Sequence, residues 1–240
     1  LSFSPTQDSE WEYRPGVGFF DRKTQATKTA KEFYELGLSL AQERKTDEAL
    51  AVFNLILKHV TDPEIVELTK VRKGETLWSG SRFTQAYQEC DDFLRLYPES
   101  AHAQKAKRLA MESAFLLAQE GEVEPFLGIL PILRTSEPGI NLLRSILQRY
   151  PREPFTSLYY YKLAKFLVDD GQLDKAENEI KFILSEYKDT LEAPKSILLL
   201  GEIGLMKFDA VDYDIRGLQD GRRNFTRFVD EAKVLAQISP

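Results

Sequence analysis

Cysteine is almost absent from this chain, whose 240 residues include only one, Cys90. A single cysteine cannot form an internal disulfide, and with only two histidines the chain has little from which to build a zinc site. The 13 glycines are scattered and form no phosphate-binding loop. No stretch approaches the roughly eighteen unbroken apolar residues that mark a transmembrane helix. We therefore expect no disulfide, no metal, no cofactor and no membrane-spanning segment.

Positive charge is also in short supply. The chain has 32 Lys and Arg against 38 Asp and Glu, a net charge of -6 at pH 7. Nucleic-acid-binding domains usually carry the opposite sign, so we expect no nucleic-acid partner. Hydrophobic residues make up 42% of the chain, which supports a real core and excludes wholesale disorder. The length fits one or two ordinary domains or one elongated array of repeats.

No arrangement of side chains typical of catalysis is present. The sequence lacks His-Glu-x-x-His, Gly-x-Ser-x-Gly and any pairing of cysteine and histidine with an orienting acid. We interpret His59 and His102, which fall near expected helix ends, as surface or capping residues. Cys90 replaces a larger residue of a packing stripe and is interpreted as a small core residue rather than a reactive thiol. We predict that the protein is not an enzyme.

Small residues recur in pairs twelve positions apart from about residue 28 onward. This spacing is typical of tetratricopeptide units, in which small side chains lie where two helices cross closely and larger ones fill the gaps beside them. In the second unit, Lys70 and Lys73 occupy places that are usually apolar. The pairs at this spacing are Gly37 and Ala49, Gly74 and Ala86, and Ala164 and Ala176.

Two further units carry the same pattern with insertions. In the third unit, Ala110 and Gly139 are 29 positions apart, and in the fifth unit, Gly201 and Gly221 are 20 positions apart. The extra residues include 121–125 and 130–131 in the third unit and 208–214 in the fifth, and we expect the insertion of the fifth unit to be a loop. Insertions in repeat proteins normally lie on one face of the array.

The sequence thus predicts an all-α fold, a curved solenoid of five tetratricopeptide-like helix pairs. Each pair can bury only one face against its neighbours, so we expect residues 28–240 to fold as a single body. Prolines mark several hinges, because proline cannot continue a helix. The pairs are expected at about residues 28–60, 63–97, 100–150, 155–188 and 191–237.

Residues 1–27 show no helical period and are expected to form an extended amino-terminal arm. The run from Trp11 to Phe20 is unusually aromatic for a free linker. Exposed Trp and Phe are disfavoured in disordered segments, so we expect this arm to lie against the folded body.

Charged residues cluster around the insertion of the fifth unit. Asp209, Asp212 and Asp214 could suggest a calcium site, but neither the glycine nor the bidentate glutamate of a calcium loop is correctly placed. A solvated loop is the better interpretation. The basic residues of the last helix form either a solvated face or a docking patch for an anionic partner; they are Arg222, Arg223 and Arg227.

Repeat arrays of this kind bind peptides in the groove lined by the first helix of each pair. The helical register predicts which side chains face that groove. Trp78 lies off the packing stripe, which indicates a binding anchor unless the amino-terminal arm covers it. The predicted groove residues are Tyr34 and Leu38 in the first unit, Val71, Glu75 and Trp78 in the second, Lys107 and Met111 in the third, and Tyr161 and Lys165 in the fourth.

Five such units, with a long insertion in the third and an acidic loop in the fifth, resemble one family in particular. This is the BamD family, the tetratricopeptide lipoproteins of the machinery that inserts β-barrel proteins into bacterial outer membranes. The resemblance covers the chain from about Lys31 to Val229. It is carried by residues 33–37 (FYELG), 93–98 (FLRLYP), 146–151 (ILQRYP), 193–202 (APKSILLLGE), 212–214 (DYD) and 224–228 (NFTRF).

The resemblance implies a non-catalytic scaffold on the periplasmic face of the bacterial outer membrane. Its lipid anchor would be a cysteine that follows a secretory signal upstream of Leu1. The amino-terminal units would bind the extended carboxyl-terminal segments of unfolded barrel proteins, and Lys107 could pair with a terminal carboxylate. The carboxyl-terminal units would dock other subunits of the assembly complex through Asp212, Tyr213, Asp214, Arg222, Arg223 and Arg227.

Two other interpretations stay open. The chain lacks the family's lipidated cysteine, and its aromatic arm differs from the short arm of the family, so it could be a periplasmic repeat scaffold of cell-division or peptidoglycan-linked envelope complexes. A cytosolic co-chaperone would need a two-carboxylate clamp of Lys, Asn and Arg in the groove. Lys31 could supply one member of that clamp, and the rest cannot be assigned.

The fold class has a direct spectroscopic consequence. We expect the far-ultraviolet circular dichroism spectrum of the purified protein to be dominated by helix, because helical periodicity runs almost throughout residues 28–237. A spectrum with a substantial strand contribution would contradict the predicted fold.

Overall fold

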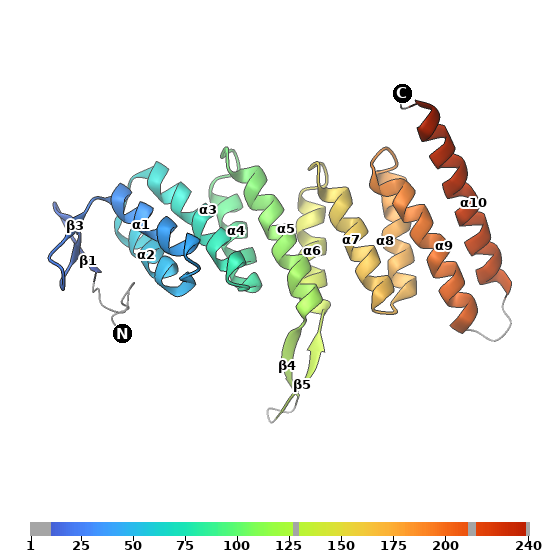
Figure 1. Ribbon diagram of the computed structural model, residues 1–240, viewed down its shortest axis with the longest axis horizontal. Helices are drawn as coiled ribbons and strands as arrows, with labels where there is room; N and C mark the ends of the chain where they lie inside the picture. Colours follow the sequence, from blue (N-terminus) through green and yellow to red (C-terminus); the bar gives the residue numbers. More distant parts are fainter. Residues whose placement is uncertain (1–10, 127–129, 211–214, 239–240) are drawn as a thin grey trace. The chain divides into compact units, whose positions relative to one another are not determined.

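A computed structural model describes residues 11–126, 130–210 and 215–238 (Figure 1). The predicted docking residues Asp212, Tyr213 and Asp214 lie outside these ranges. The chain divides into two compact units, residues 1–146 and residues 147–240, which we call the amino-terminal and carboxyl-terminal units. That residues 28–240 form a single body stays a prediction.

Helices dominate both units. Within the described residues, the amino-terminal unit holds α1 (Ala30–Gln42), α2 (Thr46–His59), α3 (Pro63–Ser79), α4 (Phe83–Leu96), α5 (Ala103–Glu120) and most of α6 (Glu137–Arg149). The carboxyl-terminal unit holds α7 (Thr156–Asp169), α8 (Leu173–Glu186), α9 (Glu192–Ala210) and α10 (Ile215–Ile238). Consecutive helices lie side by side as pairs, as Figure 1 shows for α1 with α2, α3 with α4, α7 with α8 and α9 with α10. The all-α fold of helix pairs is therefore confirmed. No helix in the described ranges is both long and apolar enough to cross a membrane.

Two small antiparallel sheets lie outside the helix pairs, and the sequence analysis predicted neither. The arm forms a three-stranded sheet in the order β1 (Trp11–Arg14), β2 (Gly18–Asp21) and β3 (Thr27–Lys28). In its register, Trp11 lies opposite Asp21 and Arg14 opposite Gly18. The insertion of the third unit forms a hairpin of β4 (Glu122–Phe126) and β5 (Leu130–Thr135), with a register shift at Glu124 and Pro125.

Local signals explain where the first and third helices begin. Thr29 and Glu32 form a reciprocal capping box at the start of α1, which satisfies backbone donors that the helix leaves unpaired. Asp62 caps α3 by accepting hydrogen bonds from the backbone of Glu64 and Ile65, and Pro63 occupies the first turn, where its missing N–H costs nothing.

The small residues of the repeat pattern lie at close helix crossings. A Cβ atom on Gly37 of α1 would come within 2.5 Å of the Phe53 ring of α2. The same holds at Gly201 of α9, where the ring of Phe225 from α10 would be 2.6 Å away. In each case an aromatic ring fills the space that the missing side chain leaves, as the pattern predicts.

The two insertions change the crossings in ways the spacing did not predict. Gly139 of α6 lies against the backbone of Ala118, where a Cβ atom would be 2.2 Å from the backbone nitrogen, and not against Ala110. The extra residues of the third unit lengthen α5 to Glu120 and form the β4–β5 hairpin. In the fifth unit, residues 208–210 were expected in a loop, but they belong to α9, which continues to Ala210.

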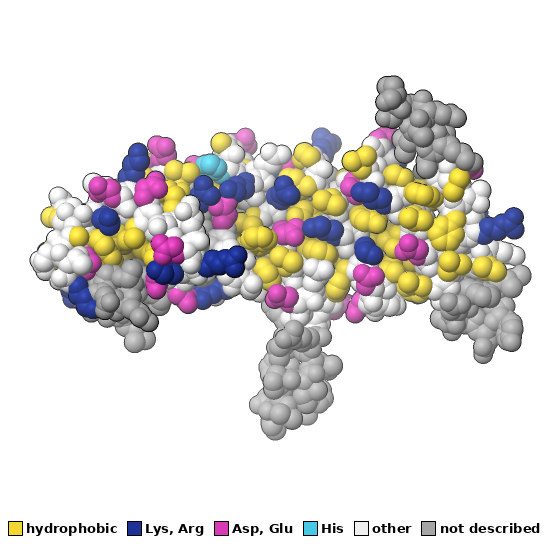
Figure 2. Space-filling model, viewed as in Figure 1, with side chains coloured by type: hydrophobic (Ala, Val, Ile, Leu, Met, Phe, Trp, Pro, Cys, Tyr) yellow, Lys and Arg dark blue, Asp and Glu magenta, His cyan; other side chains and the backbone are white. Residues whose placement is uncertain are grey.

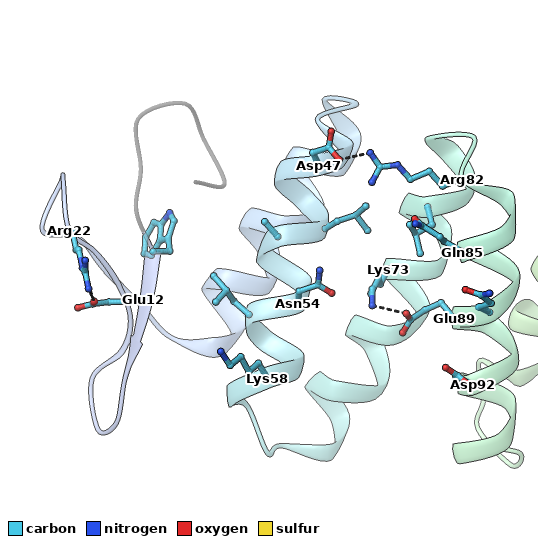
Figure 3. Close-up of a pocket in the computed structure, with 16 residues that line it drawn as sticks. Glu12, Arg22, Asp47, Asn54, Lys58, Lys73, Arg82, Gln85, Glu89 and Asp92 are labelled. Atoms are coloured by element: carbon cyan, nitrogen blue, oxygen red, sulfur yellow. Dashed lines mark hydrogen bonds and ion pairs between the residues drawn. The ribbon is translucent and has the colours of Figure 1, made fainter. Parts of the chain in front are cut away.

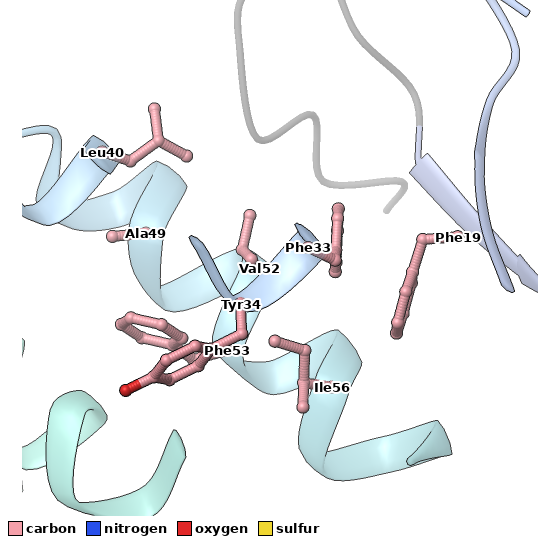
Figure 4. Close-up of a cluster of buried hydrophobic side chains, with 8 residues drawn as sticks. All are labelled: Phe19, Phe33, Tyr34, Leu40, Ala49, Val52, Phe53 and Ile56. Atoms are coloured by element: carbon pink, nitrogen blue, oxygen red, sulfur yellow. The ribbon is translucent and has the colours of Figure 1, made fainter. Parts of the chain in front are cut away.

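The arm lies against the first helix pair, as its aromatic content predicts. The Phe19 ring stacks on Phe33 of α1 at 4.0 Å between centroids, and Trp11 lies 5.1 Å from the same ring. Tyr13 stacks on His59 at the end of α2, with centroids 4.9 Å apart. Phe19 and Phe33 are fully buried in one cluster with side chains of α1 and α2 (Figure 4). The arm is thus part of the core of the amino-terminal unit.

A close approach of backbone to backbone in the carboxyl-terminal unit generates a stability prediction. A Cβ atom on Gly204 of α9 would lie 2.7 Å from the backbone nitrogen of Gly221 and 2.8 Å from the carbonyl oxygen of Gly217. Since backbone cannot move aside as a side chain can, we expect Gly204→Ala to lower the free energy of unfolding by about 1–2 kcal/mol, despite the better helix propensity of alanine.

Urea unfolding followed by circular dichroism measures this difference. Gly74→Ala is the matched control, because the Cβ atom it adds would meet only the ends of two side chains, Cys90 at 3.0 Å and Leu109 at 3.6 Å. We expect the control to unfold near the wild-type midpoint. Equal midpoints for Gly204→Ala and wild type would show that the α9–α10 crossing is looser than described.

The single cysteine gives a second prediction. Cys90 is 3% exposed on α4, and burial raises the pKa of its thiol, so the reactive thiolate is disfavoured at neutral pH. We expect iodoacetamide to leave Cys90 unmodified in the native protein at pH 8 and to alkylate it fully in urea, as measured by intact mass. Rapid alkylation of the folded protein would contradict the interpretation of Cys90 as a core residue.

Candidate functional site

A groove of about 800 Å³ runs along the outer side of α2 in the amino-terminal unit (Figure 3). Helix α2 supplies the residues between the two walls, the arm supplies one wall, and α3 and α4 supply the other. The α2 residues recur every three or four positions, so they lie on one face of the helix. The lining residues are Trp11, Glu12 and Arg22 of the arm, Asp47, Leu50, Ala51, Asn54, Leu55 and Lys58 of α2, Lys73 and Leu77 of α3, and Arg82, Gln85, Gln88, Glu89 and Asp92 beside or on α4.

Most charges of the groove are compensated by a neighbour. Arg22 donates to Glu12 at 2.7 Å through its Nε, and this bond, with a second from Arg14, lowers the pKa of the Glu12 carboxyl. Arg82, which precedes α4, pairs with Asp47 at the start of α2 and so closes one end of the groove. These pairs lie on the rim, where each contributes little to stability by itself.

A carboxylate of α4 explains the two lysines that the repeat pattern did not expect. Glu89 lies 2.7 Å from Lys73 Nζ and 3.8 Å from Lys70 Nζ, and all three side chains are largely buried. The lysines can occupy usually apolar places on α3 because α4 supplies the opposite charge. This pairing also places Lys73 and Glu89 between the walls of the groove.

Four polar side chains of the groove make no hydrogen bond or ion pair with any described residue. They are Asn54 and Lys58 on α2, and Gln85 and Gln88 on α4, and all four are exposed. Beside them, Leu50 packs with Leu77 and Ala86 in a small apolar cluster. The groove therefore combines apolar surface with unused donors and acceptors. The sequence analysis did not predict this groove, although the spacing of three or four positions between its α2 residues indicates that they share one face of the helix.

The first helices of the three amino-terminal pairs share a polar network. Glu75 of α3 accepts a 2.7 Å hydrogen bond from Arg72 and forms an ion pair with Lys105 of α5. Arg72 also interacts with the Tyr34 hydroxyl of α1, and the bonds to Glu75 and then Tyr34 raise the pKa of Arg72. Of these, the sequence analysis selected Tyr34 and Glu75, whereas Arg72 and Lys105 were missed.

The other predicted groove residues differ in exposure. Met111 is fully buried and Val71 is 6% exposed, so neither has surface for a ligand in this conformation. Tyr34 is 8% exposed and belongs to the core cluster, against which Leu38 packs. Lys107 is half-buried. Trp78 is 37% exposed, and the described part of the arm packs on α1 and α2.

The remaining candidates lie in the carboxyl-terminal unit. Tyr161 is half-buried, whereas Lys165 is exposed and lies 4.0 Å from Asp169. Arg222, Arg223 and Arg227 are on α10, where they line a shallow depression of about 510 Å³, and Arg223 pairs with Asp220. This arrangement fits both a solvated face and a docking patch for an anionic partner.

Exposed apolar side chains gather on the carboxyl-terminal unit. Figure 2 shows them over α7 and α9, and Leu205 and Met206 near the end of α9 are 40% and 45% exposed. On the face drawn in the same figure, charged side chains are interspersed with apolar ones over the amino-terminal unit. The two units therefore differ in surface chemistry on this face.

The two histidines lie at helix ends, His59 as the last residue of α2 and His102 directly before α5. His59 stacks on Tyr13, and His102 precedes α5 without a capping hydrogen bond from its side chain. In the described ranges, no group of three or more His, Cys, Asp or Glu side chains could hold a metal ion.

Comparison with known proteins gives similarity of fold only. No protein-family model and no curated protein matches the chain. Among solved structures, the chain is similar to MamA from Desulfovibrio magneticus RS-1, at 16% identity and a TM-score of 0.46, over 85% of this chain and 96% of that one. It is also similar to kinesin light chain TPR-like repeats from Podosopora anserina, at 12% identity and a TM-score of 0.43, over 86% and 96% of the two chains. A third is TTC0263, a thermophilic TPR protein of Thermus thermophilus, at 17% identity and a TM-score of 0.37, over 85% and 92%. Since these scores are low, the assignment of tetratricopeptide-like helix pairs rests on the helices of this chain.

Proposed function

We propose that this protein is a non-catalytic adaptor that binds extended segments of other proteins along the first helices of its amino-terminal pairs. The observation that carries the proposal is the exposure of Trp78, which lies one turn from Glu75 on α3. A large aromatic side chain on a surface of helix pairs is the residue type that most often anchors a partner.

The polar network around Glu75 supports this proposal because it orders the surface beside Trp78. Arg72, Glu75 and Lys105 connect α3 with α5, and Tyr34 adds α1. A partner that binds across the three helices would meet side chains already held in place, and binding to an ordered surface costs less conformational entropy.

The finer proposal concerns the partners and the compartment. The resemblance to the BamD family supports a role in outer-membrane protein assembly, in which this protein is a lipid-anchored subunit on the periplasmic face of the outer membrane. Its ligands would be carboxyl-terminal segments of unfolded barrel proteins, and the arginines of α10 would dock other subunits. The alternative is a periplasmic scaffold of cell-division or peptidoglycan-linked complexes, which would use the same surfaces for other proteins.

The test is a titration calorimetry experiment with a peptide that alternates apolar and polar residues and ends in an aromatic residue with a free carboxylate. We expect Trp78→Ala to weaken binding about thirtyfold, because truncating an aromatic anchor costs roughly 2 kcal/mol and 1.4 kcal/mol is a factor of ten. The circular dichroism spectrum should stay unchanged, since Trp78 is exposed.

Phe182→Ala is the matched control, since Phe182 is an aromatic residue of the carboxyl-terminal unit with 40% exposure. We expect it to bind the peptide like wild type. Equal affinity of wild type and Trp78→Ala would refute the site on α3. A peptide of the same composition with a scrambled order should bind more weakly, and if it binds equally well, the preference for barrel-protein segments is wrong.

A further inference from the structure

We propose that the groove along α2 is a second peptide-binding site, which takes a short extended segment carrying a carboxylate beside apolar side chains. It is separate from the surface around Trp78, because its residues come from α2, from α4 and the residue before it, from Lys73 and Leu77 of α3, and from the arm. Its volume of about 800 Å³ lies within the range of clefts that hold ligands.

The length of the groove suits a peptide. Asp47 and Lys58 mark the two ends of the α2 contribution and are eleven residues apart. At a helical rise of ~1.5 Å per residue, this span is about 16 Å. An extended chain advances ~3.3 Å per residue, so about five residues would fit along it.

The walls of the groove match the two kinds of group that an extended chain presents. Leu50, Leu55 and Leu77 offer apolar surface to its side chains. The unpartnered amides of Asn54, Gln85 and Gln88 can each donate and accept, so they can pair with the N–H and C=O groups of a peptide backbone. A purely apolar ligand would leave these amides unpaired, which favours a peptide.

The charge of the groove selects a carboxylate. Most charged side chains of the groove are neutralised by an opposite charge, in the ion pairs Arg22–Glu12, Arg82–Asp47 and Lys73–Glu89. Asp92 accepts a hydrogen bond from Arg95 and is neutralised in the same way. Within the described residues, this leaves Lys58 as a lining cation with no ion-pair partner. Figure 3 shows it at the end of α2 opposite Asp47. Since the other charges of the groove are neutralised, the Lys58 ammonium is the group that attracts an anionic group of the ligand.

Trp11 provides a reporter for the site. Its ring is half-buried, packs near Phe33 and also lines the groove. The chain has two tryptophans, so Trp78→Phe leaves Trp11 as the sole source of indole fluorescence. The same substitution removes the indole of the proposed anchor on α3, and because Trp11 lines the groove, its emission reports on this site.

The experiment titrates the 240-residue Trp78→Phe protein with the acetylated and amidated peptide Ser-Leu-Ala-Leu-Asp-Leu-Ser and follows Trp11 emission. We expect saturable binding, and about fivefold weaker binding for the same peptide with Asn in place of Asp, as for a partly exposed ion pair. Adding Lys58→Ala should weaken binding of the Asp peptide by the same factor and remove the preference for Asp over Asn. Lys58→Glu should prefer a peptide with Lys at that position.

Lys188→Ala is the matched control, because Lys188 is an exposed lysine of the carboxyl-terminal unit that does not line the groove. It should bind both peptides like its parent. The Asn peptide with a free carboxyl terminus shows whether the anion is a side chain or a chain terminus. If this peptide binds as tightly as the Asp peptide, and Lys58→Ala weakens its binding, a chain terminus is a ligand. If it binds as weakly as the amidated Asn peptide, the ligand is an acidic side chain.

Three outcomes would overturn the proposal. The first is no change in Trp11 emission with any of the peptides up to millimolar concentration. The second is equal affinity for the Asp and Asn peptides. The third is a concentration-dependent dimer that Lys58→Ala dissociates, because the groove would then hold a second copy of this chain.

Discussion

The close crossing of paired helices is the constraint on which the rest of the structure depends. Two helices can approach this closely only where a side chain is missing, and Gly37, Gly201 and Gly204 supply the gaps. Phe53 and Phe225 then fill the space with aromatic rings. Because the packing of protein interiors leaves few voids, each contact between a glycine and an aromatic ring fixes the crossing angle of the two helices and the position of one helix along the other. The outer faces of the second helices, including the groove side of α2, follow from that geometry.

The helix pairs could be predicted from the sequence because their signal is local. A small residue twelve positions after another places both at one crossing, so the spacing of Gly37 and Ala49 is enough to indicate a helix, a turn and a helix. The β-sheets could not be predicted in the same way. Strands of two to six residues show too little alternation to stand out, although the Pro15-Gly16 dipeptide between two aromatic runs is a turn signal that would have favoured a hairpin.

The candidate sites were only partly predictable because they depend on contacts between pairs. Helical register selected Tyr34, Glu75 and Trp78, which the structure places on or beside one network. It also selected Met111, which is fully buried, since register gives a direction around a helix and does not show which neighbour covers it. Glu89 explains Lys70 and Lys73, and it became visible only when α4 was placed against α3. The groove could not be predicted because it forms only when the arm, α3 and α4 are all placed around α2.

The arm sheet also limits how this array can be extended. In the amino-terminal unit, Phe19 covers the side of the first helix pair that faces away from α3, as Figure 1 shows for β1 and β3. A preceding repeat would have to stack on that same surface, and it would displace a fully buried aromatic ring to do so. The arm is thus a terminator of repeat stacking, built from strands instead of a polar helix. It follows that a preceding repeat, or a second copy stacked end to end on this surface, would first have to displace the arm from the first helix pair.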